Sequence, residues 1–148
     1  GKPDAEAYLT SLGADAVIDR ATLAEPGKPL QKERWNGVID AVGGNTLANA
    51  CAQTRYSGAV AACGLAESPK LQTTVMPFIL RGVTLYGIDS VMAPLERRER
   101  AWQCIAKYLN TEALDGMVEE ISLAQALTEA SSVMAGQVTG RLLVDVNR

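Results

Sequence analysis

The stretch Val38-Ile-Asp-Ala-Val-Gly-Gly44 decides the fold, because a short apolar run ends there in two glycines. A similar run and ending return in Ala59-Val-Ala-Ala-Cys-Gly-Leu65 and in Val83-Thr-Leu-Tyr-Gly-Ile-Asp-Ser90. The chain between successive runs is long enough for one helix. Nearly continuous apolar runs are typical of parallel strands that are covered on both faces. The pattern therefore predicts an α/β fold with right-handed crossovers between parallel strands.

The ends of these three runs also indicate a ligand site. In an open parallel sheet, ligands bind beyond the carboxyl ends of the strands. Glycine at such an end lets a ligand approach the backbone closely. Taken alone, Val42-Gly43-Gly44 is better explained as a plain turn between a strand and a helix, whereas three such ends together favour one shared site. The sequence contains no glycine-rich phosphate loop of the kind that a complete dinucleotide site has.

The rest of the chain alternates between helical and strand patterns. Residues 21–36 are polar and contain prolines, so they are expected to form mostly loop. Asn45 is expected to cap the helix that follows the first glycine pair, and Ser122 and Gln125 form a capping box. The pattern predicts helices over 3–12, 45–53, 76–80, 94–109 and 123–134, and further strands over 16–18, 117–122 and 141–146. The inward stripe of the longest helix is expected to be Leu95, Arg98, Ala101, Trp102, Ile105 and Leu109.

Composition narrows the function classes. The chain has 148 residues, 47% of them hydrophobic and 21% charged, with a net charge of −3. This balance predicts a globular protein without a general attraction to nucleic acid or to an anionic membrane. No apolar run is long enough to span a membrane and no signal peptide opens the chain, so we expect a cytoplasmic protein. The absence of histidine excludes Ser-His-Asp and Cys-His catalysis and histidine metal ligands within this chain.

The cysteines and one aspartate are the first candidates for chemistry. Cys63 ends an apolar run, and nothing in the sequence lowers its pKa, so a buried structural thiol is favoured over a nucleophile. The same interpretation applies to Cys51 and Cys104. Three cysteines, an odd number and widely spaced, predict neither a disulfide framework nor a zinc site. Asp40 lies inside an apolar run, where a carboxylate needs hydrogen-bond donors such as backbone N–H groups. A structural role for Asp40 is favoured over acid-base catalysis.

Basic and polar residues near the strand ends are candidates for ligand contacts. Lys2 precedes the first helix and Arg20 follows the 16–18 strand. In a dinucleotide site, basic residues in this neighbourhood select the 2′-phosphate of NADP, although both residues are equally well solvated surface charges. Asp89 and Ser90 either hydrogen-bond a ligand or cap the segment that follows them.

Several longer motifs give the chain a family resemblance. They are Tyr8-Leu-Thr-Ser-Leu-Gly-Ala14, Trp35-Asn-Gly-Val-Ile-Asp-Ala-Val-Gly43, Ala52-Gln-Thr-Arg-Tyr-Ser-Gly58, Val60-Ala-Ala-Cys-Gly-Leu-Ala66, Thr73-Thr-Val-Met-Pro-Phe-Ile-Leu-Arg81, Gly87-Ile-Asp-Ser-Val-Met92 and Val138-Thr-Gly-Arg141. On these motifs the chain resembles the C-terminal half of zinc-independent medium-chain dehydrogenase/reductases. It is most similar to their NADPH-dependent acryloyl-CoA reductase branch, which also carries the name quinone oxidoreductase.

The resemblance implies a partial Rossmann-type, mostly parallel sheet that lacks its first two strands, followed by a short C-terminal strand-helix-strand segment. Residues 1–110 would form the partial NADP-binding domain. Residues 111–148 would return to the catalytic domain that this family carries in its N-terminal half. The implied activity is hydride transfer from NADPH to an activated C=C bond of an enoyl thioester or a quinone. We expect this chain alone to be an inactive cofactor-domain fragment, with no catalytic residue and no metal of its own.

The resemblance also implies the residues that bind NADPH. Lys2 would meet the adenosine 2′-phosphate with Arg20 beside it, and Ser90 would lie at the nicotinamide end. The full set of expected cofactor contacts is Lys2, Arg20, Val42, Gly43, Gly64, Leu65, Ile79, Ser90 and Gln137. The expected partners are a small-molecule substrate in the parent enzyme and a second copy of the chain, paired through the third strand as a sheet edge.

Two other functions remain open from the sequence. The chain is alternatively a non-catalytic α/β remnant that self-associates, or a nucleotide-binding module. A different Rossmann enzyme, such as a methyltransferase, fits the strand-end motifs less well.

Overall fold

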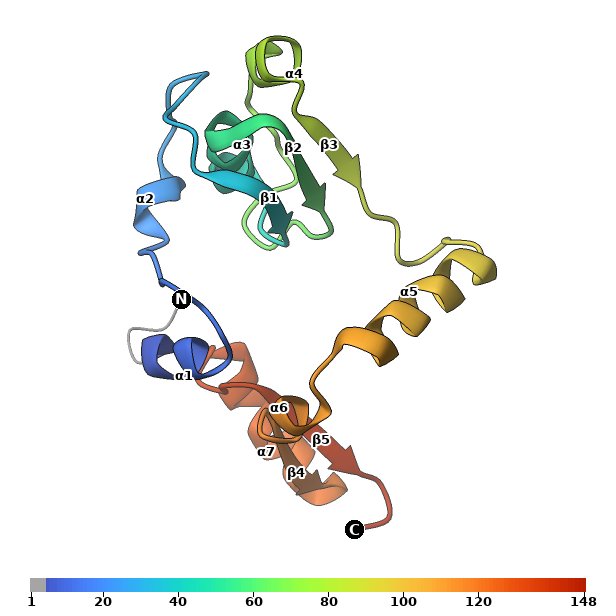
Figure 1. Ribbon diagram of the computed structural model, residues 1–148. Coiled ribbons are helices and arrows are strands. Elements are labelled where there is room, and N and C mark those ends of the chain that lie inside the picture. The colour runs from blue at the N-terminus through green and yellow to red at the C-terminus, as the bar shows by residue number, and fades with distance from the viewer. Residues whose placement is uncertain (1–4) are drawn as a thin grey trace. The chain divides into compact units, whose positions relative to one another are not determined.

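The computed structural model describes residues 5–148, and their contacts divide them into two compact units (Figure 1). The first unit is Ile18–Pro94, and the second contains Leu95–Arg148 together with residues 5–17. The first unit ends at Pro94, whereas the predicted nucleotide-binding domain extends to residue 110. The predicted division into residues 1–110 and 111–148 refers to domains of the full-length family members, and it stays a prediction.

The first unit contains a parallel sheet of three strands. They are β1 (Trp35–Asp40), β2 (Thr54–Ala62) and β3 (Thr84–Gly87), in the order β1-β2-β3. Both pairings are parallel, and the register pairs Asp40 with Ala62 and Ala62 with Gly87. The last residues of the three strands are therefore neighbours across the sheet. This arrangement confirms the prediction that the three apolar runs, each ended by glycine or another small residue, form parallel strands of one sheet.

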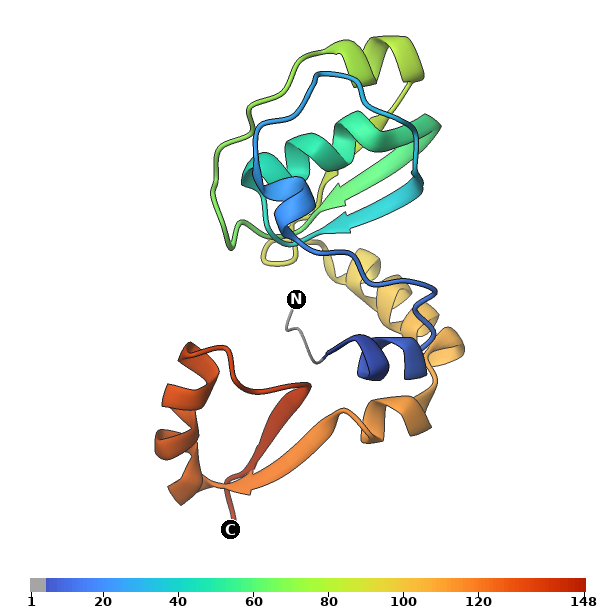
Figure 2. The ribbon, with the colours of Figure 1, turned by 90° about the vertical axis from the view of Figure 1, so that its left-hand side faces the viewer.

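Helices cover one face of this sheet. The unit contains α2 (Ala21–Ala24), α3 (Gly44–Gln53) and α4 (Met76–Arg81), and Figure 2 shows α3 lying along β1 and β2. The buried core joins Leu47 and Cys51 of α3 to Val60 of β2 and to Val83. Burial of these apolar side chains supplies the main stabilisation of the unit.

The opposite face of the sheet is not covered within the unit. Ile39, Ala61 and Tyr86 lie in one row across the three strands. The side chains of Ile39 and Tyr86 are 85% and 53% exposed. The continuous apolar runs predicted strands covered on both faces, and within this unit that expectation is wrong for the face that carries this row.

Two local predictions also differ from the structure. Residues 16–18 form no strand, and the short helix α2 follows them. Asn45 does not cap α3, because the helix begins one residue earlier and its N-cap is Gly43, at φ 75°. The side-chain amide of Asn45 instead donates to the carbonyl oxygen of Ala24 at 2.9 Å. This hydrogen bond holds α2 beside the first turn of α3.

The second unit combines helices with a two-stranded parallel sheet. Its capping box is formed as predicted, since Ser122 N–H donates to Gln125 Oε1 at 2.9 Å and Gln125 N–H donates to Ser122 Oγ at 3.3 Å. The predicted inward stripe of the long helix is exposed, with Trp102 at 63%. The elements are α1 (Glu6–Ser11), α5 (Leu95–Tyr108), α6 (Thr111–Asp115), β4 (Val118–Ser122), α7 (Leu123–Met134) and β5 (Arg141–Asp145). Within residues 5–148 no helix has the length and apolar character needed to cross a membrane.

Candidate functional site

The turns that follow β1 and β2 are joined by backbone hydrogen bonds. Ala66 N–H donates to the carbonyl oxygen of Ala41 at 3.2 Å, and Glu67 N–H donates to that of Val42 at 2.9 Å. Gly43 and Ser68 form a further parallel bridge. Residues 41–44 and 63–68 therefore make one continuous surface beyond the strand ends, which we call the strand-end ledge.

Close backbone packing explains the glycines of this ledge. Gly43 and Gly44 have φ values of 75° and 59°, a conformation that favours glycine. A Cβ on Gly43 would also collide with the carbonyl oxygen of Ser68. A Cβ on Gly64 would lie only 2.6 Å from the carbonyl oxygen of Ala41. The ledge can form only where the two turns carry no side chain at these contacts.

Asp40 is buried where β1 meets the ledge. Its residue surface is 4% exposed, its Oδ2 accepts a hydrogen bond from Gly43 N–H at 2.9 Å, and its carbonyl oxygen accepts one from Cys63 N–H at 2.8 Å. The predicted structural role with a backbone N–H partner is confirmed. Burial, and secondly the negative charge of Asp40, raise the pKa of the Cys51 thiol to about 11. Cys51 is therefore a protonated core residue at neutral pH.

A cleft opens between the ends of β2 and β3. Its volume is about 460 Å³, and its lining residues are Ala62, Cys63, Gly64, Leu65, Gly87, Ile88 and Asp89. Leu65 is 64% exposed and Ile88 is 49% exposed, so the walls present apolar side chains to solvent. An apolar cleft beyond the carboxyl ends of parallel strands suits the flat ring of a nucleotide cofactor. We call it the strand-end cleft.

A tight turn closes the β3 side of the cleft. Asp89 Oδ1 accepts hydrogen bonds from Val91 N–H at 2.9 Å and from Met92 N–H at 3.0 Å. These two bonds, led by that of Met92, hold the pKa of Asp89 below its usual value. Of the two roles left open for Asp89, the structure shows that it caps the following segment.

The cysteines differ in exposure, which corrects part of the sequence interpretation. Cys51 is buried as predicted, but Cys63 and Cys104 are exposed. Cys63 is exposed because the chain leaves the sheet at Ala62, and its Sγ donates to the carbonyl oxygen of Asp40 at 3.2 Å. Cys63 is one of the residues that line the strand-end cleft. In residues 5–148, no group of three or more His, Cys, Asp or Glu side chains is arranged to hold a metal ion.

The structure brings several of the expected cofactor residues together. Val42 and Gly43 lie on one turn of the ledge, and Gly64 and Leu65 lie on the other. Ser90 directly follows Asp89 at the rim of the strand-end cleft. These five residues surround the carboxyl ends of the three strands.

The other expected cofactor residues are more scattered. Arg20 is exposed and immediately precedes α2, which is hydrogen-bonded to the first turn of α3. Ile79 lies on α4, which leads into the amino end of β3, so it is not brought together with the ledge. Gln137 belongs to the second unit, and Lys2 lies outside the described residues. For all nine expected residues, those around the strand ends included, the cofactor contact stays a prediction.

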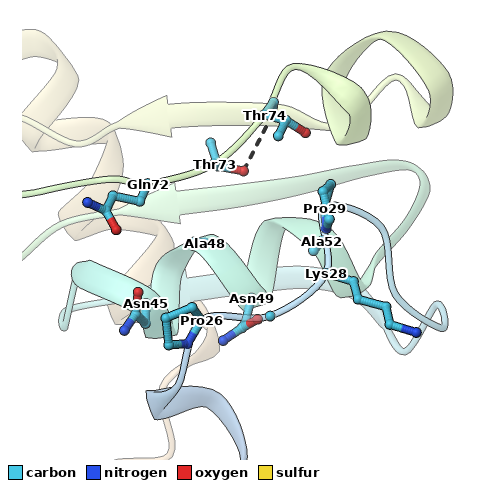
Figure 3. A pocket seen from close by; sticks show the side chains of 11 residues that line it. Pro26, Lys28, Pro29, Asn45, Ala48, Asn49, Ala52, Gln72, Thr73 and Thr74 are labelled. Atoms are coloured by element: carbon cyan, nitrogen blue, oxygen red, sulfur yellow. Dashed lines mark hydrogen bonds between the residues drawn. The ribbon is translucent and has the colours of Figure 1, made fainter.

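A separate cavity of about 390 Å³ lies along the stripe of α3 that carries Asn45 and Asn49 (Figure 3). The loop 26–29 and residues 72–74 complete its walls. Asn49 Nδ2 donates to the carbonyl oxygens of Leu23 and Glu25 at 2.9 and 2.8 Å, and its Oδ1 accepts from Gln31 Nε2 at 2.6 Å. The amide of Asn49 thus holds the loop. Unlike the strand-end cleft, this cavity is not lined by the carboxyl ends of strands.

Sequence reasoning missed the role of Glu67. Thr46 Oγ1 donates to Glu67 Oε2 at 3.1 Å, which places this carboxylate beside the first turn of α3. A carboxylate at a helix N-terminus stabilises the helix dipole. The N-cap Gly43 has no side chain for this purpose. No local sequence signal predicts the contact, because Glu67 comes from the turn after β2.

Comparisons with known proteins agree with this geometry. The family model described as zinc-binding dehydrogenase matches residues 1–107. The acrylyl-CoA reductase AcuI of Ruegeria pomeroyi is 46% identical over 148 residues, which are 99% of this chain and 45% of that protein. The chain spans less than half the length of the curated relatives it matches.

Two solved structures are similar over nearly the whole chain. That of E. coli K-12 YhdH with bound NADPH has a TM-score of 0.91 and 49% identity, and that of Bacillus subtilis YhfP with bound NAD has 0.90 and 36%. Each match covers 99% of this chain and 45% of the other. The resemblance to the C-terminal, cofactor-binding half of these proteins and the predicted partial Rossmann-type sheet are therefore confirmed.

Proposed function

This chain belongs to the zinc-binding dehydrogenase family, and we propose that it forms the NADPH-binding part of a reductase that acts on an activated C=C bond. The similarity to a relative solved with NADPH carries the proposal, because it covers 99% of the chain at 49% identity. The bound cofactor supplies the hydride. The residues of this chain bind and orient it.

The strand-end ledge and cleft support nucleotide binding at this place. Val42, Gly43 and Gly64 give a surface without large side chains, and Leu65 adds an exposed apolar wall. We assign the nicotinamide end to the cleft near Ser90. We assign the adenosine 2′-phosphate to the neighbourhood of Arg20, where α2 is held against α3.

The proposed substrate is an enoyl thioester of the acryloyl-CoA type, because a curated relative with 46% identity carries that activity in its name. The reduction is proposed for the full-length enzyme rather than for these 148 residues alone. We further propose that the enzyme works without zinc, since its motifs are those of the zinc-independent branch. We place it in the cytoplasm as a homodimer that pairs through the free edge of β3.

Nucleotide titration tests the binding proposal. NADPH and NADH are added separately to the chain, and nicotinamide fluorescence is followed. We expect NADPH to bind more tightly than NADH. Arg20→Glu should lower the NADPH affinity about tenfold and leave NADH binding unchanged. Arg55→Glu makes the same charge change at the amino end of β2 and should have no effect. The proposal fails if neither nucleotide binds at millimolar concentration.

A chimera tests the activity. The matching C-terminal part of the Ruegeria pomeroyi relative is replaced by this chain, and NADPH oxidation is measured with acryloyl-CoA and with a quinone. We expect turnover of the thioester and none by this chain alone. A folded chimera that binds NADPH but reduces only the quinone would change the substrate assignment. Light scattering on the same chimera tests the homodimer.

A further inference from the structure

We propose that Asp40 is a positioning residue for the nucleotide, because it fixes the turn 41–44 that forms half of the strand-end ledge. This inference rests on the proposed NADPH binding. It assigns a role in affinity to a carboxylate that faces a backbone amide rather than a reacting atom.

The hydrogen bonds of Asp40 reach both turns of the ledge. Its Oδ2 accepts from Gly43 N–H at 2.9 Å, and its carbonyl oxygen accepts from Cys63 N–H at 2.8 Å. Leu47 N–H in turn donates to the carbonyl oxygen of Gly43 at 3.1 Å. Gly43 is therefore held on one side by the end of β1 and on the other by α3. Gly43 has a φ of 75° in this position, where it also forms the bridge to Ser68.

The burial of the Asp40 carboxylate lowers the stability of the fold, because the charged group loses its hydration. Only 4% of the residue surface is exposed, and no ion pair of the described residues includes it. A buried carboxylate destabilises a fold unless hydrogen bonds compensate for its lost hydration. The groups that face it are Gly43 N–H and the thiol side of Cys51, whose pKa its charge helps to raise. Among the hydrogen bonds and ion pairs of residues 5–148, the side chain of Asp40 takes part in the one that holds the glycine turn.

Glycine turns lose the most conformational entropy when they are fixed. A turn that is already fixed avoids that loss when a ligand binds, so preorganisation increases affinity. If Asp40 supplies this preorganisation, the position of its acceptor oxygen matters and its charge does not. If the role of Asp40 were purely structural, replacing it would lower the stability of the fold and leave the NADPH affinity of the folded protein unchanged.

Two substitutions separate the acceptor from the charge. Asp40→Asn keeps an oxygen at the same place and removes the charge, whereas Asp40→Glu keeps the charge and displaces the oxygen. We expect Asp40→Asn to bind NADPH within about twofold of the unchanged chain and Asp40→Glu to bind it about tenfold more weakly. Thr54→Val is the control, because it removes the buried hydrogen bond from Thr54 Oγ1 to the Ala50 carbonyl at the other end of β2. It should lower stability without changing affinity.

Amide hydrogen exchange of Gly43, measured by NMR, gives a second readout. Exchange should be faster in Asp40→Glu and unchanged in Asp40→Asn and Thr54→Val. Equal NADPH affinity in Asp40→Glu and the unchanged chain overturns the inference, as does an equal loss in Asp40→Glu and Thr54→Val. If the unchanged chain binds no NADPH, the functional proposal has failed. Whether Asp40 fixes the turn 41–44 is then still decided by the exchange of Gly43, and equal rates in Asp40→Asn and Asp40→Glu refute that contact.

Discussion

The guanidinium of Arg81 donates through Nη2 to the carbonyl oxygen of Gln31 at 2.6 Å, across 50 positions of the sequence. Its Nη1 donates to the carbonyl oxygens of Ala52 and Thr54 at 2.8 and 3.3 Å, and its Nε lies 3.3 Å from a carboxylate oxygen of Glu33. The side chain is 15% exposed. One residue at the end of α4 therefore joins the end of α3, the start of β2 and the loop before β1.

Replacing Arg81 should destabilise the first unit strongly. Arg81→Met removes one donor from each of three carbonyl oxygens and the cation beside the Glu33 carboxylate, and we expect the free energy of unfolding in urea to fall by about 3 kcal/mol. Arg55→Met is the matched control, because Arg55 is exposed and its Nη1 donates to a single side-chain oxygen of the described residues, Asn36 Oδ1, at 3.2 Å. That variant should change stability by less than about 0.5 kcal/mol. Similar losses in the two variants would contradict the proposed importance of the Arg81 contacts.

The two glycines of the strand-end cleft should respond differently to the same substitution. Gly64→Ala places a methyl group 2.6 Å from the carbonyl oxygen of Ala41 and should cost about 1–3 kcal/mol by separating the two turns of the ledge. Gly87→Ala meets no atom within 4 Å, so we expect no loss and a gain of up to about 1 kcal/mol. Thermal unfolding of both variants checks this, and a destabilised Gly87→Ala would show that the space at β3 is smaller than described.

The thiol of Cys51 should make stability fall at alkaline pH. Its pKa is raised from 9.0 to about 11 in the folded chain, so between these values the unfolded state releases a proton that the folded state keeps. The contribution of this group to stability is complete below pH 9 and is lost as the pH rises from 9 through 11, by about 3 kcal/mol in all. Urea unfolding across this range should show a smaller alkaline loss in Cys51→Val. An identical pH dependence in the two proteins would disprove the assignment.

The exposed thiols give a test of cofactor position. Cys63 and Cys104 should react with a thiol reagent at neutral pH, while the buried Cys51 reacts only after unfolding. Because Cys63 lines the strand-end cleft, NADPH should slow its modification and leave that of Cys104 unchanged. Mass spectrometry of the labelled peptides separates the three sites. Equal protection of Cys63 and Cys104 would move the nucleotide away from this cleft.

The sequence predicts the parallel sheet and the alignment of its carboxyl ends correctly, because these depend on local patterns. Apolar runs fix the strands, and the glycines at 43 and 64 mark where the chain leaves the sheet. The capping box of Ser122 is also local, since its two hydrogen bonds span three residues. Asp40 was predictable for the same reason, as its donor Gly43 is three positions away.

Contacts between distant segments could not be predicted in this way. Glu67 stabilises a helix that begins 23 positions earlier, and Arg81 reaches a loop 50 positions away. Exposure of Cys63 depends on where β2 ends, and an apolar run does not reveal that boundary. The failed strand at 16–18 has a similar cause, because a short apolar segment forms a strand only where a partner strand is available.

The row of Ile39, Ala61 and Tyr86 on the uncovered face of the sheet also gives the protein an optical probe. Tyr86 lies half-exposed on the edge strand, and Ala61, with its small side chain, separates it from Ile39 in the row. The absorption and emission of a phenol ring change when water around it is replaced by apolar groups. The difference spectrum between the chain and Tyr86→Phe will therefore report whatever comes to cover this face, without an added label.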